Sequence, residues 1–136
     1  MRILRSSLNI STRSRFEVID ITSMIENWLR ESNVGNGLLL VYTPHTTAAL
    51  AINEYESGLR QDILEMLKSL TKPDAHWRHN LIDNNAHAHL ANIIVGGDKI
   101  VPVENGKLTL GTWQRLLFIE LDGPRRREVR LVYVGE

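Results

Sequence analysis

The five histidines of this chain lie in three short segments, and none occurs before residue 45 or after residue 89. The segments are PHTTA at 44–48, HWRHN at 76–80 and AHAHL at 86–90. Imidazole is the commonest side-chain ligand of protein-bound metals, and its charge changes near neutral pH. One histidine from each segment would supply three nitrogen ligands and leave a fourth position open, which is the arrangement of a catalytic zinc site.

The spacing of the histidines leaves a second interpretation open. The gaps from His45 to His79 and from His79 to His89 match no local zinc motif, so these side chains are equally explained as loop histidines with ordinary hydrogen bonds. If residues 86–90 are helical, His87 and His89 point in different directions, because neighbours on one helix face are three or four positions apart. Only one of the two is then expected to face a shared site.

Size and composition restrict the class of protein. With 136 residues the chain is expected to form one domain with its own core, and its 0 cysteines exclude disulfides, thiolate zinc sites and a cysteine nucleophile. The 16 basic and 16 acidic side chains cancel, which argues against recruitment of nucleic acid or an anionic membrane. No signal-peptide pattern and no apolar run long enough to span a bilayer occurs. We therefore expect a cytoplasmic enzyme or binding protein.

Two segments carry apolar residues at the spacing of an amphipathic helix, and a third is marked by the residues at its ends. Ser23 and Glu26 form a capping-box pattern at the start of the first segment. Pro73 stops the second, and Asn85 is the predicted cap of the third, which ends at a Gly-Gly pair. The patterns predict helices at about 21–29, 59–70 and 86–95.

The remaining patterned segments favour strands, and the Asn105-Gly106 pair between two of them predicts a hairpin turn. About eight strand segments and three helical segments mostly do not alternate, which favours an α+β fold with antiparallel sheets over a doubly wound parallel fold. Residues 71–85 are predicted to be a long irregular segment, and loops of this length are often functional. We expect strands at 3–10, 15–19, 38–42, 49–52, 99–103, 108–110, 115–121 and 128–134.

Several motifs along the chain occur in the order seen in one known family. They are PHTTA at 44–48, INE at 52–54, WRHN at 77–80, AHL at 88–90, IVPV at 100–103, NG at 105–106 and LGTWQ at 110–114. With these motifs the chain resembles the YjbQ-like family, also called the secondary thiamine-phosphate synthase family. The resemblance covers the chain from about residue 5 to its end.

This resemblance implies a single YjbQ-like domain over residues 1–136, with sandwich-like antiparallel sheets and two to three helices. It also implies a homotrimer that holds a divalent metal, with zinc the expected ion. The matching metal ligands in this chain are His45, His79 and His89. His76 and His87 fall at positions where family members vary, so neither is expected to be a ligand.

The activity associated with the family is a weak, secondary thiamine-phosphate synthesis. A pyrimidine methyl diphosphate loses pyrophosphate, and the nitrogen of a thiazole phosphate captures the pyrimidine methylene. We assign Arg78 to the pyrophosphate, because its guanidinium matches phosphate oxygens, Gln114 to a heterocycle, and Glu54 to general-base catalysis. Pyrophosphate release normally uses magnesium on carboxylates, so a histidine site predicts that another, unassigned substrate is the physiological one. The candidate substrate-binding residues are Thr46, Thr47, Asn53, Gly111, Thr112 and Trp113.

Several of these residues have a structural alternative. Glu54 is equally explained as a solvated loop acid, and Trp113 as a core or interface residue. The arginine run 125–127 is suited to gripping a phosphate, but in a chain without net charge we expect a solvated turn or a subunit contact. For the whole chain, the alternatives to a thiamine-phosphate synthase are a metal-dependent hydrolase or a non-catalytic trimer that binds a phosphorylated small molecule or a metal.

Overall fold

Eight strands and three α-helices make up the chain, which a computed structural model describes from residue 1 to residue 136. The helices are α1 (Thr22–Ser32), α2 (Ser57–Leu70) and α3 (Ala86–Val95), and a short 3-10 helix, η1 (Arg78–Leu81), precedes α3. The strands are β1 (Arg2–Ser11), β2 (Glu17–Asp20), β3 (Gly37–Tyr42), β4 (Ala48–Asn53), β5 (Asp98–Glu104), β6 (Lys107–Leu108), β7 (Arg115–Glu120) and β8 (Arg126–Gly135). The predicted α+β class is confirmed.

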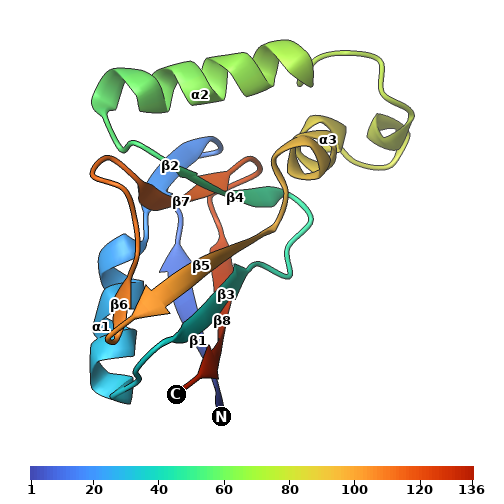
Figure 1. Cartoon of the computed structure of the whole chain (residues 1–136). Helices are drawn as coiled ribbons and strands as arrows, with labels where there is room; N and C mark the ends of the chain where they lie inside the picture. The colour runs from blue at the N-terminus through green and yellow to red at the C-terminus, as the bar shows by residue number, and fades with distance from the viewer.

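The strands form two sheets in which every paired neighbour is antiparallel. The large sheet has the order β1-β8-β3-β5-β6, and the small sheet has the order β2-β7-β4. In Figure 1, α2 and α3 lie on the side of the small sheet that faces away from the large sheet, and both termini lie together at the far end of the large sheet. None of the helices is both long enough and apolar enough to cross a bilayer.

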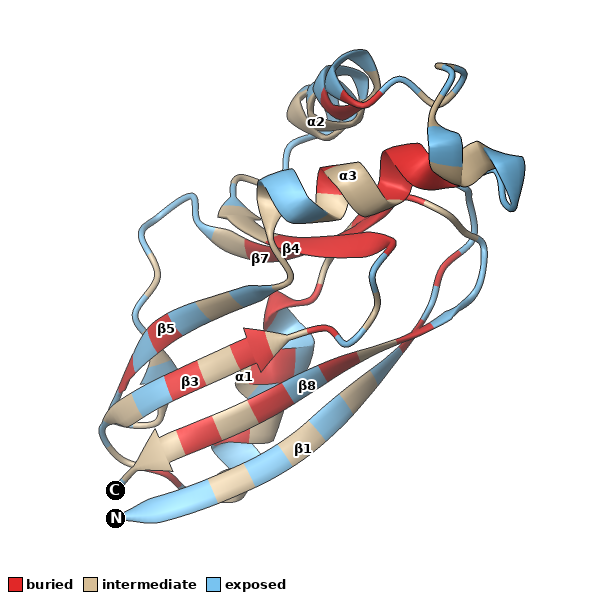
Figure 2. Cartoon of the chain, turned by 90° about the vertical axis from the view of Figure 1, so that its right-hand side faces the viewer, coloured by how far each residue is buried: buried red, intermediate tan, exposed pale blue.

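The main core lies between α1 and the inner face of the large sheet. Ile21, Ile25 and Leu29 recur at helical spacing, and all three are buried in one cluster with Leu39 and Tyr133 of the sheet. Side chains alternate between the two faces of a strand, so buried residues alternate with half-buried or exposed ones along β3 and β8, as Figure 2 shows. The outer face of the large sheet is left uncovered in this chain.

A second, smaller cluster attaches α2 and α3 to the small sheet. Leu67 of α2 and Ala88 and Ala91 of α3 pack with Ala49 of β4 and Ile119 of β7. The opposite face of the small sheet belongs to the main core. Strand β7 is therefore buried on both faces, which explains why its sequence is a continuous apolar run rather than an alternating one. This packing fixes α3, the helix that carries two of the histidines.

A buried ion pair joins the two sheets. Glu120 ends β7 of the small sheet, Arg127 lies at the start of β8 of the large sheet, and their side chains are 0% and 1% exposed. Arg127 Nε donates to Glu120 Oε1 at 2.9 Å, and its Nη2 donates to the other carboxylate oxygen and to the hydroxyl and carbonyl of Thr47. Thr12 Oγ1 donates to Glu120 at 2.7 Å. The expectation of a solvated turn or subunit contact is therefore wrong for Arg127.

The helix starts differ from the predicted caps. Ser23 lies inside α1, whose N-cap residue, Ile21, makes no side-chain capping bond, so the capping box is absent. Asn85 does occupy the N-cap position of α3, but its side chain bonds elsewhere. At α2 the N-cap residue itself caps the helix, because the Glu56 carboxylate accepts two backbone N–H bonds. The predicted strands are present with shifted ends, and that at 15–19 begins only at residue 17.

The buried ion pair predicts a sharp contrast within the arginine run. Arg127→Met should lower the free energy of unfolding by about 3–5 kcal/mol, because Glu120 would be left charged, buried and without its partner. Arg126→Met is the matched control, since Arg126 is exposed, and it should change stability by no more than about 0.5 kcal/mol. Urea unfolding of both variants measures the difference, and equal losses would refute the structural role assigned to the pair.

Candidate active site

Two of the three predicted metal-binding histidines lie together beside η1 and α3. The rings of His79 in η1 and His89 in α3 meet edge to face, with their centroids 4.8 Å apart. Both line a cavity of about 560 Å³ together with Arg78, and His76, Trp77, Ala86 and Leu90 complete its wall. The segment predicted to be a long functional loop therefore does form a cavity, and three imidazoles and a guanidinium border it.

Local hydrogen bonds fix the shape of this segment. The Trp77 indole N–H donates to the carbonyl of Lys72 at 2.8 Å, which closes the turn that enters η1. The N–H of Ala86 donates to Asn80 Oδ1 at 3.1 Å, so η1 supplies the cap of α3. Because η1 and α3 are tied together in this way, the positions of His79 and His89 relative to each other are set by short-range structure.

The His79 ring is also held from behind by residues that sequence reasoning missed. Its Nε2 lies 3.0 Å from Asn85 Oδ1, and Asn85 Nδ2 donates to Asp122 Oδ2 at 2.8 Å. Arg125 Nη2 donates to the same Asp122 oxygen at 2.9 Å. The sequence offered one signal for these hydrogen bonds. Asn85 has the residue type and position of a helix cap, but its side chain bonds to His79 and Asp122 instead of to the helix.

His45 lies apart from the other two histidines, in the loop between β3 and β4. Its Nε2 accepts the backbone N–H of Glu128 at 2.9 Å. Burial, and then the positive charge of Arg127, lower the pKa of His45 and favour its neutral form. A neutral imidazole whose Nε2 accepts a hydrogen bond carries its proton on Nδ1, so in this conformation neither nitrogen offers a free lone pair. His45 and Thr46 line a separate cavity of about 600 Å³.

No group of three or more histidine, cysteine, aspartate or glutamate side chains in the chain is arranged to hold a metal ion. The structure brings His79 and His89 together but does not add His45 to them. The side chains of one chain therefore do not fit a three-histidine zinc centre, although they offer a pair of imidazoles. The metal stays a prediction.

A third location collects residues of two other motifs. Glu54, Thr112 and Trp113 line a cavity of about 310 Å³ whose wall also includes Tyr55 and Glu56 and the Asp20–Arg115 ion pair. Burial alone would raise the pKa of Asp20, but hydrogen bonds from Thr22 and Arg115 outweigh it and lower that pKa. Trp113 is 70% exposed, so its interpretation as a core residue is wrong.

The other predicted site residues use their polar groups internally. Thr47 is buried, and its hydroxyl and carbonyl both accept from Arg127. Asn53 Oδ1 accepts the N–H of Glu54 at 2.8 Å. Gln114 Oε1 accepts the N–H of Gly111 at 2.8 Å, which folds the side chain back onto its own motif. In this conformation these groups shape the loops around the cavities.

His87 is a buried structural residue. It is 1% exposed, its Nε2 lies 3.1 Å from Arg15 Nη2, and its ring packs beside Phe16 with centroids 5.4 Å apart. Burial, followed by the positive charge of Arg15, lowers the pKa of His87. Since Arg15 is a donor only, neutral His87 accepts through Nε2.

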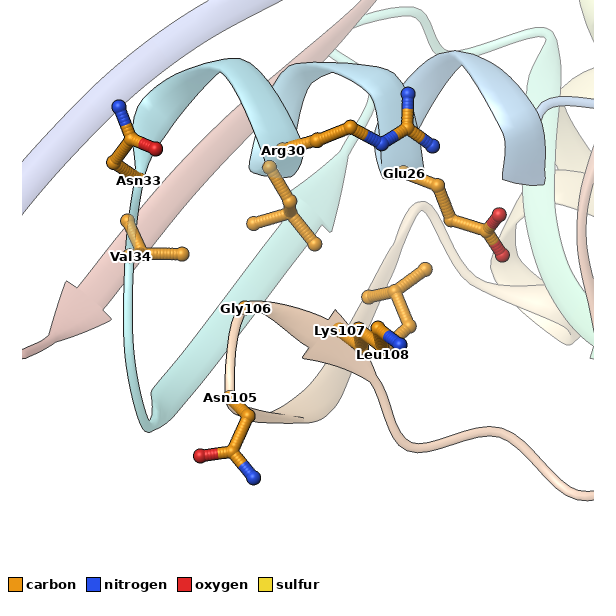
Figure 3. Close-up of a pocket in the computed structure, with 9 residues that line it drawn as sticks. Glu26, Arg30, Asn33, Val34, Asn105, Gly106, Lys107 and Leu108 are labelled. Carbon is orange, nitrogen blue, oxygen red and sulfur yellow. The ribbon is translucent and has the colours of Figure 1, made fainter.

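A further cavity, of about 400 Å³, lies between α1 and the turn that joins β5 to β6 (Figure 3). Its polar wall carries charges of both signs, from Glu26, Arg30 and Lys107. No histidine and none of the predicted site residues borders it. The histidines and the other predicted site residues that border a described cavity therefore lie at the other three.

Comparison with known proteins identifies the family to which this arrangement belongs. The family model described as "UPF0047 protein YjbQ-like" matches residues 6–136. The chain belongs to the YjbQ-like UPF0047 family. A UPF0047 protein of Methanothermobacter thermautotrophicus is 46% identical over 136 residues, which is 100% of this chain and 95% of the relative. One from Archaeoglobus fulgidus is 51% identical over 122 residues, 90% of this chain and 94% of the relative.

Solved structures of YjbQ-like proteins share the fold. A hypothetical protein from Aeropyrum pernix K1 is 53% identical with a TM-score of 0.96, and the match covers 98% of this chain and 99% of that one. A YbjQ-like protein of unknown function from Sulfolobus solfataricus P2 is 43% identical with a TM-score of 0.97, and the match covers 99% of both chains. The single-domain α+β architecture is thus shared along almost the full length.

The buried histidine of this YjbQ-like chain predicts a specific pH dependence. Because the pKa of His87 is lower in the folded state than the ordinary value of 6.5, the unfolded chain takes up a proton first as the pH falls below 6.5. Folding stability should therefore decrease from that pH downward. His87→Gln should make this decrease shallower, leaving the part due to His45, whose pKa is lowered in the same direction.

Exposed His76 supplies the control for this experiment. His76→Gln should keep the pH dependence of the wild-type protein in urea unfolding between about pH 7 and 5. An unchanged slope in His87→Gln would contradict the assignment of His87 as a buried, neutral side chain.

Proposed function

We propose that the cavity formed by η1 and α3 binds the phosphate or diphosphate group of a small-molecule substrate and supports group transfer from it. The observation that carries the proposal is the convergence of His79 and His89 on a cavity that Arg78 also borders. A guanidinium pairs with two phosphate oxygens at once, and an imidazolium can protonate or hydrogen-bond a leaving group. Both the guanidinium and the imidazolium would therefore stabilise a phosphate or diphosphate as it leaves.

Weak, secondary thiamine-phosphate synthesis is the concrete reaction in this proposal. The C–O bond between the pyrimidine methylene and the diphosphate breaks, and its electron pair leaves with pyrophosphate. The thiazole nitrogen then forms the C–N bond to the methylene. Arg78 would neutralise the departing charge, and His79 and His89, each as a protonated imidazolium, would donate hydrogen bonds to its oxygens. Glu54, Thr112, Trp113 and Gln114 are proposed to hold the second substrate.

A divalent metal, with zinc as the expected ion, completes the proposal without entering any of these steps. When bound, it would supply positive charge beside the phosphate oxygens. If it binds, His79 and His89, whose rings lie in contact, would hold it in place of their hydrogen bonds to the phosphate oxygens. The physiological substrate is proposed to be a phosphorylated small molecule other than the thiamine precursors.

We further propose that the complete site forms between copies of the chain in a homotrimer. The chemistry-bearing residues line three separate cavities that share no residue. Large apolar side chains are exposed near the first cavity and on the outer face of the large sheet, where Leu38 is 53% and Ile100 is 62% exposed. Exposed apolar patches mark protein interfaces. A neighbouring copy on such a patch would bring the motifs of two chains together.

Substitution of the histidines tests the catalytic proposal. His79→Ala and His89→Ala should each reduce product formation by about 10²–10⁴-fold, the range for loss of a general acid or base. His45→Ala should have a comparable effect only if all three histidines act together. His76→Ala and His87→Ala should have much smaller effects, and His79→Ala and His89→Ala should retain a cooperative melt because the core does not include either ring.

The measurements are thiamine-phosphate formation from the two precursors and a phosphate-release screen, each with and without chelator, alongside elemental analysis of the purified protein. Wild-type rates in the variant that lacks His45, His79 and His89 would refute a role for these histidines in that reaction. Binding of a phosphorylated compound without turnover would support the non-catalytic function instead, and release of inorganic phosphate would support a hydrolase.

Complementation between subunits tests the shared site. His89→Ala and Glu54→Gln are each expected to inactivate a homotrimer, because each removes one half of every site. After subunit exchange at equal concentrations, about a quarter of the wild-type activity should return, since one neighbour pair in four combines the two intact halves in the correct order. Absence of any recovery in mixed trimers, or a monomer by light scattering at micromolar concentration, would refute the shared site.

A further inference from the structure

The orientation of the Asn85 side chain is determined by its two neighbours. Asn85 is buried, and one end of its amide meets Asp122 while the other meets His79. The Asp122 carboxylate is paired with Arg125 and can only accept hydrogen bonds. The amide must therefore present its Nδ2 to Asp122, and this leaves Oδ1, which is also only an acceptor, facing the imidazole.

This orientation determines where His79 carries its proton. Because Asn85 Oδ1 cannot donate, the His79 Nε2 that lies 3.0 Å from it must be protonated. In a neutral imidazole the lone pair is then on Nδ1. We propose that Asp122 and Asn85 are positioning residues that fix His79 as its Nε2–H tautomer, so that Nδ1 is the atom with which His79 accepts a hydrogen bond or a proton in the cavity.

The positioning residues are themselves firmly held. The Arg125 guanidinium contacts Asp122 twice, through Nη2 to the carboxylate at 2.9 Å and through Nε to the backbone carbonyl at 2.8 Å. The N–H of Asp122 donates to Glu120 Oε2 at 3.1 Å, which connects this loop to the buried ion pair. The series from Glu120 to His79 therefore starts at the most buried charge in the chain and ends at the cavity.

The hydrogen bond from Nε2 also favours the use of Nδ1. In metal-bound histidines, a carboxylate or carbonyl that accepts one ring N–H fixes the tautomer and makes the other nitrogen more basic. Here an amide oxygen receives that N–H, and the carboxylate behind it orients the amide. Only the use assigned to Nδ1 rests on the proposed function; the tautomer follows from the hydrogen bonds alone.

Nitrogen-15 NMR of the full-length, histidine-labelled protein without substrate tests the inference directly. The neutral form of His79 should show a protonated Nε2 and an unprotonated Nδ1. Asn85→Leu should speed exchange of the Nε2 proton with water by about tenfold, the equivalent of one hydrogen bond. Asn84→Leu is the matched control, because Asn84 is exposed and its side chain makes no such bond; it should leave the exchange unchanged.

Asp122→Asn provides a second variant in case Asn85→Leu fails to fold. Its amide can donate as well as accept, so Asn85 could turn over, and the Nδ1–H form of His79 should become detectable. Wild-type His79 with its proton on Nδ1, or wild-type populations and exchange in both variants, would overturn the inference.

Discussion

The buried pair of Glu120 and Arg127 is the interaction on which the arrangement of the candidate site depends. Removing two charges from water is costly, and a pair of this kind persists only when further hydrogen bonds satisfy both groups. Here Thr12, Thr47 and two backbone N–H groups supply them. Burial would raise the pKa of Glu120, but the bonds from Arg127 and Thr12 outweigh it and lower that pKa. The pair thus stays charged while it joins the sheets, the loop before β4 and the loop after β7.

The elements were predictable where one local pattern decides the structure. Helical spacing located α1 and α2, because burial of one helix face imposes this period, and the apolar run 38–42 located β3. Helix starts were less predictable, since several nearby groups compete for the first N–H groups. Arg127 was missed because a run of arginines resembles a solvated turn. Its position in phase with the buried residues Val129 and Leu131 of β8 was the signal that could have identified it.

The candidate site was predictable only where local structure positions its residues. His79 and His89 lie together because η1 leads directly into α3, so the sequence distance between them is bridged by local structure. The position of His45 depends instead on the pairing of β3 with β8, a contact between distant segments that no local pattern specifies. The hydrogen bond from the Glu128 N–H to His45 is a product of that pairing, and it engages one of the two ring nitrogens through which His45 could ligate a metal.

The two histidines have opposite preferences, and this limits how a metal could bind. His79 has its proton on Nε2 and a free Nδ1, whereas neutral His45 accepts on Nε2 and carries its proton on Nδ1. To ligate through Nε2, His45 would have to give up the Glu128 N–H, and leaving that group unpaired costs about 1–3 kcal/mol. Structural zinc binding releases about 10–16 kcal/mol in small peptides, so this cost does not forbid the rearrangement. A single chain therefore offers one imidazole nitrogen that is already oriented, and a metal held by all three histidines would require a rearranged loop or a neighbouring copy.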